Sequence, residues 1–123
     1  MTHSRPQILE LLDRHGLSPS RALGQNFVAD PNTVRRIVRL AEVTSDSTVI
    51  EIGPGLASLT LALVETGATV YAVEIDRHLI PVLTDVLAGT GATVVHADAL
   101  HVDFRSLIGT GPATLVANLP YNV

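Results

Sequence analysis

The sequence predicts an α/β domain in which a parallel sheet alternates with helices and follows a helical extension. Short β-branched runs recur after residue 47 and are separated by helical patterns, as in right-handed βαβ units. These runs are predominantly apolar, which is typical of strands that are buried on both faces. Residues 1–45 instead show helical patterns and a loop. Together these observations predict a doubly wound sheet.

Two helices are expected ahead of the sheet. Residues 6–15 place apolar side chains at helical spacing and stop at Gly16, and "LSPSRALGQNF" then has the composition of a loop. Asp30 can cap the next helix, with Pro31 in its first turn. The buried stripe of that helix is expected to hold Val34, Ile37, Val38 and Ala41, with Arg35, Arg36 and Arg39 largely on the other side.

Four strands follow, at 48–52, 68–76, 92–98 and 113–119. Helical patterns at 56–67 and 77–89 separate the first three, and 103–109 is a short helix or turn. Pro81 must lie in the first turn of its helix or kink it.

Composition narrows the class of protein. The 123 residues allow one domain, and 46% apolar residues supply a core. No apolar run is long enough to span a bilayer, and the first residues do not resemble a signal peptide. The absence of cysteine excludes disulfides and thiolate chemistry. We therefore expect a cytoplasmic protein that does not enter a membrane.

The charge is unevenly distributed. Residues 1–39 hold six arginines against three acids, and residues 40–123 hold two arginines against nine acids, for a net charge of −4. A basic arm on an acidic body permits contacts with phosphate groups, although solvated helix faces explain the pattern equally well. His3, His15 and His78 are expected at the surface.

The carboxyl ends of the predicted strands carry the candidate ligand residues. "VIEIGPGLASLT" places Gly53 and Gly55 in a strand-to-helix turn, where a ligand can approach bare backbone, although a purely structural tight turn is the alternative. Ser58 replaces the third glycine of a dinucleotide fingerprint. Glu74 ends the second strand, where an acid accepts hydrogen bonds from ribose hydroxyls, and we prefer it to Asp76.

Two further residues belong to the same edge. Asp98 ends the third strand and can accept a hydrogen bond from an adenine amino group, or alternatively cap the following turn. Asn118 ends the fourth strand. A metal site formed by His96, Asp98, His101 and Asp103 is disfavoured, because their spacing matches no paired-histidine pattern.

Five motifs then resemble the ribosomal RNA adenine dimethyltransferase family in order and spacing: "LGQNFVAD" (23–30), "EIGPGLASLT" (51–60), "VEID" (73–76), "DAL" (98–100) and "NLPYNV" (118–123). The chain is similar to the N-terminal portion of a bacterial small-subunit member from about residue 18. Ala57 stands where many relatives have glycine. The resemblance implies a Rossmann-like S-adenosylmethionine-dependent methyltransferase fold, truncated after the fourth strand, with an N-terminal helical extension.

The resemblance also implies the reaction, which is dimethylation at N6 of two adjacent adenosines near the 3′ end of small-subunit (16S) ribosomal RNA. S-adenosyl-L-methionine is the implied cofactor and the immature 30S particle the implied partner. The implied cofactor-binding residues are Gln25, Asn26, Val28, Gly53, Gly55, Glu74, Asp98 and Asn118. The arginines of the N-terminal segment are candidates for contacts with RNA phosphates.

The implied catalytic residues are Asn118, Leu119, Pro120 and Tyr121. The Asn118 side-chain oxygen and the Leu119 carbonyl can accept the two N–H groups of the target amine and stabilise its developing positive charge. Pro120 fixes the backbone that holds this carbonyl, and Tyr121 offers a face on which a flipped-out base can stack. No metal is needed.

We expect residues 1–45 to be a helical extension of the same domain as residues 46–123, which form the first half of the methyltransferase domain. The C-terminal helical domain of the family is expected to be absent, so that the chain alone would be marginally stable and inactive. The complete protein is expected to be a monomer. Three alternatives remain: a large-subunit RNA adenine methyltransferase of the macrolide-resistance type, a nicotinamide-dependent oxidoreductase, and a non-catalytic ribosome-assembly module.

Overall fold

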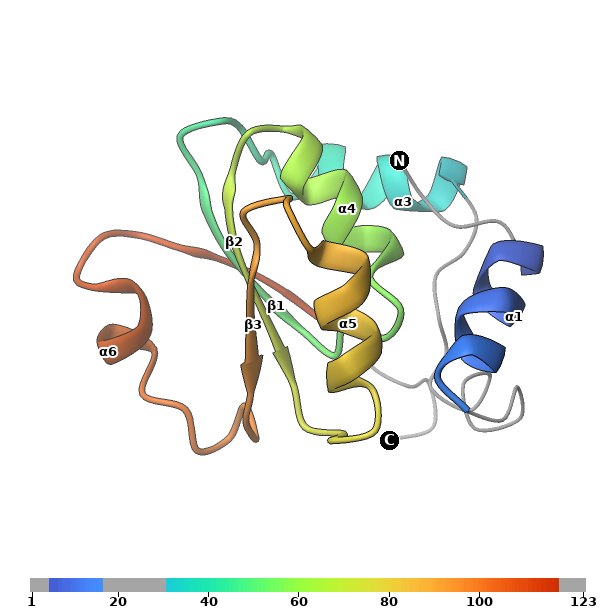
Figure 1. Ribbon diagram of the computed structural model, residues 1–123. Helices are drawn as coiled ribbons and strands as arrows, with labels where there is room; N and C mark the ends of the chain where they lie inside the picture. Colours follow the sequence, from blue (N-terminus) through green and yellow to red (C-terminus); the bar gives the residue numbers. More distant parts are fainter. Residues whose placement is uncertain (1–4, 17–30, 118–123) are drawn as a thin grey trace.

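The computed structural model describes residues 5–16 and 31–117, and Figure 1 shows the arrangement of their elements. Two helices precede the sheet, α1 (Arg5–Arg14) and α3 (Pro31–Leu40). The strands are β1 (Thr48–Ile52), β2 (Thr69–Glu74), β3 (Thr93–His96) and β4 (Thr114–Ala117). They alternate with α4 (Ser58–Glu65), α5 (Ile80–Leu87) and α6 (Phe104–Ile108).

The four strands form one parallel sheet in the order β3-β2-β1-β4. The chain therefore starts near the middle of the sheet, proceeds to β3 on one side, and returns to place β4 on the other side of β1. Ligands of open α/β sheets bind at such a reversal, outside the carboxyl ends of the strands. The predicted α/β class and the order of its elements are confirmed.

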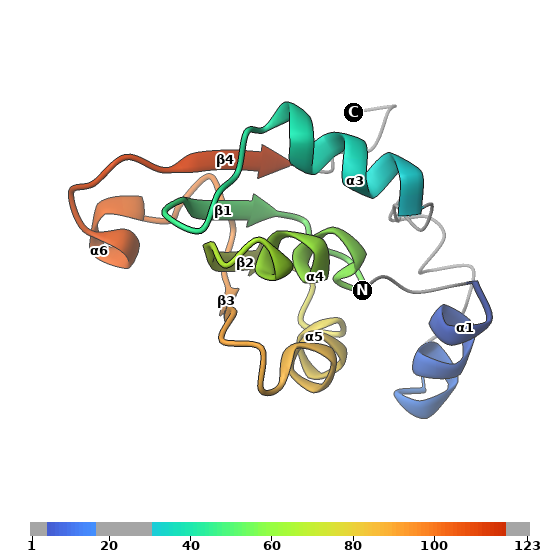
Figure 2. The same cartoon turned by 90° about the horizontal axis from the view of Figure 1, so that it is seen from above.

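Helices α3 and α4 cover one face of the sheet. Val34 of α3 and Leu63 of α4 belong to the same buried cluster as Val49, Val70 and Val116 from three of the strands. Ile37, Val38 and Ala41 pack against this cluster, so the predicted stripe of α3 is confirmed. Figure 2 shows α3 and α4 lying on the same side of β1 and β4.

The remaining core joins α5 and α1 to the domain. Leu83 and Leu87 of α5 pack with Ala72 of β2, because this face of β2 is buried by the helix. Leu12 of α1 is buried in a cluster with Leu56, which precedes α4. The helical extension and the sheet therefore share a hydrophobic core.

His15 is not the surface residue that the sequence suggested. Its side chain is 18% exposed, and its Nε2 lies 3.0 Å from Oδ2 of Asp85 on α5. Arg14 contacts the same oxygen at 3.3 Å. The hydrogen bond from His15 holds the pKa of Asp85 below its usual value, and Arg14 adds to the effect. This pairing fixes the end of α1 against α5, and nothing local in the sequence indicates it.

Most helices and strands are shorter than predicted, and local features of the chain explain where several of them begin. α4 begins at Ser58 because Ala57 has a left-handed backbone conformation. Pro81 lies in the first turn of α5, as one of the two predicted possibilities requires. Asp103 begins α6 and accepts hydrogen bonds from the backbone N–H groups of the first turn, as an N-cap does. In the described part of the chain, no helix has the length and apolar character needed to cross a membrane.

Candidate functional site

The glycine turn follows β1 directly. The backbone N–H of Gly53 donates to the carbonyl of Val73 at 3.0 Å, so the first glycine still belongs to the ladder between β1 and β2. Gly53 and Gly55 have φ angles of 70° and 59°. Residues with a Cβ rarely adopt this conformation, so glycine is required by the turn itself. The backbone is consequently bare at the edge where a ligand can approach.

Ala57 completes the turn under strain. Its φ is 72°, and its backbone N–H donates to the carbonyl of Pro54 at 2.9 Å. Ala57 makes no side-chain cap for α4, so the first N–H groups of that helix receive no bond from this residue's side chain. The conformation favours glycine at position 57. The sequence pattern pointed to Ser58 as the residue that replaces a glycine. The structure shows that the absence of glycine instead causes backbone strain at Ala57.

Glu74 ends β2 beside this turn and is 2% exposed. Its Oε2 accepts a hydrogen bond from the backbone N–H of Asp76 at 2.9 Å. Burial raises the pKa of Glu74, while backbone N–H groups of Asp76, Gly55 and Ile75 offset part of the rise. Its other oxygen, Oε1, is buried and accepts no hydrogen bond from any described residue. A buried carboxylate oxygen without a donor fits a ligand that brings hydroxyl groups.

The other two acids of the edge serve local turns. Asp76 accepts the backbone N–H of His78 at 2.9 Å. Asp98 accepts the backbone N–H of Leu100 at 3.0 Å, so the alternative role as a cap applies to one of its oxygens. Glu74 is the acid that faces the glycine turn, and the role of Asp98 toward an adenine stays a prediction.

A fourth acid, Glu51, was missed by the sequence analysis. It is the next-to-last residue of β1 and is fully buried, and it accepts a hydrogen bond from the Thr60 hydroxyl of α4. Burial raises its pKa from 4.5 to about 7, which the hydrogen bond from Thr60 lowers in part and the nearby charge of Glu74 raises further. Its Oε2 is also buried without a partner among the described residues. An acid inside a strand predicted to be buried on both faces was the available signal.

Several predicted site residues lie outside the described residues and stay predictions: Gln25, Asn26, Val28, Asn118, Leu119, Pro120 and Tyr121. The described part of β4 ends at Ala117, which pairs with Ile52, the residue before Gly53. β4 therefore reaches the edge that carries the glycine turn.

Within residues 5–16 and 31–117, no three potential metal-ligating side chains gather in one place. His96 instead lies 3.2 Å from the carbonyl of Ile75, and His101 lies 3.7 Å from Asp98. The edge thus combines a bare glycine turn with an acid whose second oxygen accepts no hydrogen bond within residues 5–16 and 31–117.

Proteins with similar sequences identify the family to which this chain belongs. The sequence profile of the family described as "Ribosomal RNA adenine dimethylase" matches residues 17–123. The chain belongs to this family. A relative from Corynebacterium jeikeium, named "Ribosomal RNA small subunit methyltransferase A", is 51% identical over 95% of the chain. A relative of the same name from Streptomyces coelicolor is 52% identical over 94% of the chain.

The fold agrees with the family. The crystal structure of the 23S rRNA methyltransferase ErmE superimposes with a TM-score of 0.67 and 34% identity, over 77% of this chain and 38% of that chain. The predicted Rossmann-like methyltransferase fold is therefore confirmed. The chain spans 40% of the length of the Corynebacterium relative and 42% of the Streptomyces relative.

Proposed function

We propose that the protein containing this chain dimethylates N6 of two adjacent adenosines near the 3′ end of small-subunit ribosomal RNA, with S-adenosylmethionine as methyl donor. The observation that carries the proposal is membership of the adenine dimethylase family, with relatives about half identical that bear the small-subunit name. The natural substrate is RNA within an immature 30S particle, in the cytoplasm.

The described residues fit the cofactor. In this proposal the Oε1 atom of Glu74 accepts a hydrogen bond from a ribose hydroxyl, which is supported by its lack of a donor among the described residues. Gly53 and Gly55 leave space for close approach, since a Cβ would be strained at their φ angles. When bound, S-adenosylmethionine supplies a methyl group activated by a sulfonium charge.

The chain contributes position and polarity rather than a strong base. The Asn118 side-chain oxygen and the Leu119 carbonyl accept the N–H groups of the adenine amine and hold its nitrogen in line for attack. Pro120 restrains the backbone and Tyr121 stacks on the flipped-out base. Asp98 orients the adenine of the cofactor, and Gln25, Asn26 and Val28 contact its methionine portion. These roles follow the family motif in the sequence.

Methylation of large-subunit RNA is the second candidate, because the chain also resembles ErmE. ErmE is named a 23S rRNA methyltransferase and shares 34% identity with the chain. The relatives that bear the small-subunit name share 51% and 52% over nearly the whole chain. The higher identity and longer match favour the small subunit.

Expression in a strain that lacks its own small-subunit adenine dimethyltransferase tests the proposal. Both ribosomal RNAs are examined by primer extension, which stops at dimethylated adenosine. We expect stops at two adjacent adenosines in 16S RNA, and none with Asn118→Ala. Stops confined to 23S RNA would show that the second candidate is correct. If calorimetry showed that the protein binds NADH but does not bind S-adenosylhomocysteine, both candidates would be refuted.

A further inference from the structure

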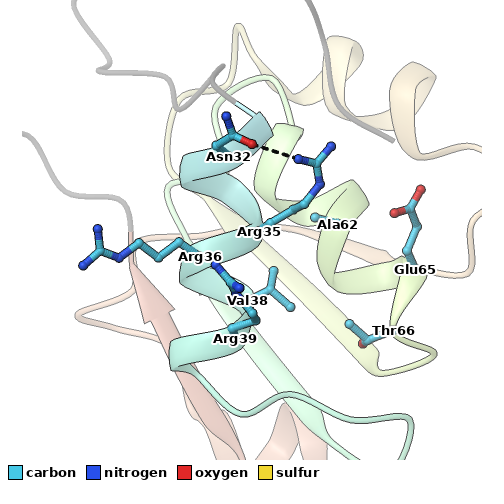
Figure 3. Close-up of a pocket in the computed structure, with 8 residues that line it drawn as sticks. All are labelled: Asn32, Arg35, Arg36, Val38, Arg39, Ala62, Glu65 and Thr66. Carbon is cyan, nitrogen blue, oxygen red and sulfur yellow. Dashed lines mark hydrogen bonds between the residues drawn. The ribbon is translucent and has the colours of Figure 1, made fainter.

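A groove of about 750 Å³ separates helices α3 and α4 on the outer surface of the domain. Figure 3 shows its described lining residues, which come from these helices and the turn after α4: Asn32, Arg35, Arg36, Val38, Arg39, Ala62, Glu65 and Thr66. None of them belongs to the glycine turn or to the acids of the carboxyl edge. The groove is therefore a second surface, separate from the proposed cofactor site.

The packing of α3 turns its arginines toward this groove and toward solvent. Val34 is completely buried, and Ile37 packs against the same core, so the core fixes how α3 is rotated. Arg35, Arg36 and Arg39 are consequently exposed. The apolar stripe that anchors the helix thus leaves three arginines exposed around the groove, with Arg35 directed toward α4 and Arg36 away from it (Figure 3).

Two of these arginines have no protein partner in the described part of the chain. Arg35 donates a hydrogen bond from Nη1 to Oδ1 of Asn32 at 3.1 Å, which orients its guanidinium. Arg36 and Arg39 form neither a hydrogen bond nor an ion pair with a described residue. By contrast, Arg14 is paired with Asp85 and Glu10 and serves to hold α1. The structure therefore separates structural from available arginines among those of the N-terminal segment whose side chains it describes.

The charge of the groove is opposite to that of the body. Three arginines and one acid, Glu65, line it. Residues 40–123 hold nine acids against two arginines. A guanidinium presents several N–H donors in a fork that matches phosphate oxygens, and Asn32 and Thr66 add neutral polar groups. The groove thus complements a phosphate-bearing ligand rather than a cation.

The extent and place of the groove favour a chain of phosphates over a single one. Arg35 and Arg39 are four residues apart on one helix, hence about 6 Å apart along its axis. Val34 of α3 shares a core cluster with Val116, the next-to-last residue of β4. The arginine-bearing helix therefore packs beside the strand that leads to Asn118.

We propose that the α3–α4 groove binds the phosphodiester backbone of RNA through Arg35, Arg36 and Arg39, beside the edge at which the target base is methylated. The inference depends on the proposed function for the identity of the ligand. Contacts of this kind fix the position of an RNA strand without reading its sequence.

The test compares matched single-charge variants of the purified protein. Arg36→Gln and Arg39→Gln each remove one exposed charge from the groove, and Arg105→Gln removes one exposed charge from α6. Binding to a fluorescein-labelled RNA stem-loop is followed by anisotropy over a range of salt concentrations. Each lost phosphate contact lowers the slope of log K against log salt by about 0.7 to 0.9.

We expect each groove variant to lower the slope by about one contact, and Arg36→Gln/Arg39→Gln to weaken binding about tenfold at moderate salt. Arg105→Gln leaves the slope and the affinity unchanged. All variants keep the parent's thermal unfolding and its calorimetric affinity for S-adenosylhomocysteine, which shows that they fold.

Three outcomes overturn the inference. The first is an equal loss with Arg105→Gln, which would indicate a general effect of charge. The second is unchanged RNA binding in the double groove variant. The third concerns a polyglutamate peptide, measured in the same assay. If the double groove variant lost binding to this peptide but kept binding to RNA, the ligand of the groove would be an acidic protein segment. A parent that binds RNA in the groove but not S-adenosylhomocysteine would refute the proposed function and leave the groove standing.

Discussion

The carboxyl edge of the sheet and the α3–α4 groove both carry charge, but they hold it in opposite ways. Glu51 and Glu74 at the edge are 0% and 2% exposed, and each has an oxygen without a described partner. The arginines of the groove are exposed to solvent, so their charges are not removed from water when the protein folds. The edge therefore holds its acids at a cost in stability, and the groove does not.

This difference indicates which class of ligand each surface can bind. A buried oxygen with a fixed direction selects a ligand by geometry, because an incorrectly placed donor leaves the oxygen unsatisfied. Exposed guanidinium groups on long side chains attract phosphates over a range of positions and lose strength in salt. The edge suits a small cofactor, and the groove suits a polymer.

The largest expected effect is the dependence of stability on the protonation of Glu51. Its pKa is about 7 in the folded protein against 4.5 as the reference value. Between these values the folded protein keeps a proton that the unfolded chain has released, so the free energy of unfolding falls as pH rises. We expect a loss of about 2–3 kcal/mol between pH 5 and pH 8 from this group.

Urea denaturation of the parent and of Glu51→Gln across this range measures the effect. The glutamine can still accept the hydrogen bond from Thr60 but does not titrate, so its stability should change less with pH. Glu74, whose pKa is also raised, is present in both proteins, so the difference between their profiles reports Glu51 together with its electrostatic coupling to Glu74. Parallel pH profiles for the two proteins would show that Glu51 is ionised at both ends of the range.

Replacing Glu74 tests the geometric selectivity of the edge. We expect Glu74→Gln to weaken binding of S-adenosylhomocysteine about tenfold to hundredfold, because a charged acceptor of hydroxyl hydrogen bonds is lost. Isothermal titration calorimetry gives the affinity. Asp76→Asn is the matched control, since the Asp76 carboxylate accepts the backbone N–H of His78. A larger loss in the control than in Glu74→Gln would place the ribose at Asp76.

The backbone strain at the edge gives a smaller effect. Ala57→Gly removes the strain of φ 72° but also one buried methyl group, so we expect a change in unfolding free energy within about 1 kcal/mol. Gly91→Ala is the reverse change at φ +85°, where a new Cβ meets no atom within 4 Å. It should cost about 1–2 kcal/mol from conformation alone. Thermal and urea unfolding of both variants would separate strain from packing, and a neutral Gly91→Ala would remove the argument for strain at Ala57.

The smallest effect belongs to the groove. Arg39→Gln should change the free energy of unfolding by no more than about 0.5 kcal/mol, as exposed residues without partners usually do. Arg105→Gln is its control in the same urea titration. Destabilisation by Arg39→Gln beyond that of the control would mean that Arg39 supports the packing of α3 on α4, and the contrast between edge and groove would fail.

The order of the elements, the position of the glycine turn and the family can all be derived from the amino-acid sequence. These features depend on local patterns: β-branched runs predict strands, apolar spacing predicts helices, and the motifs keep their order along the chain. Glu74 could be preferred over Asp76 because it ends an apolar run at the carboxyl side of a strand. The shortened ends of the strands and helices were less predictable, since turns such as the one at Ala57 compete with the pattern.

Which charged side chains are buried, and which lie together on the surface, follows from the packing of distant segments. Glu51 is buried beneath α4, which packs over β1 and supplies the Thr60 hydroxyl, and His15 meets Asp85 across 70 residues of sequence. The groove exists because the core fixes the rotation of α3 against α4. Burial, pKa and concavity depend on contacts between distant segments, and such contacts leave no local pattern in the sequence.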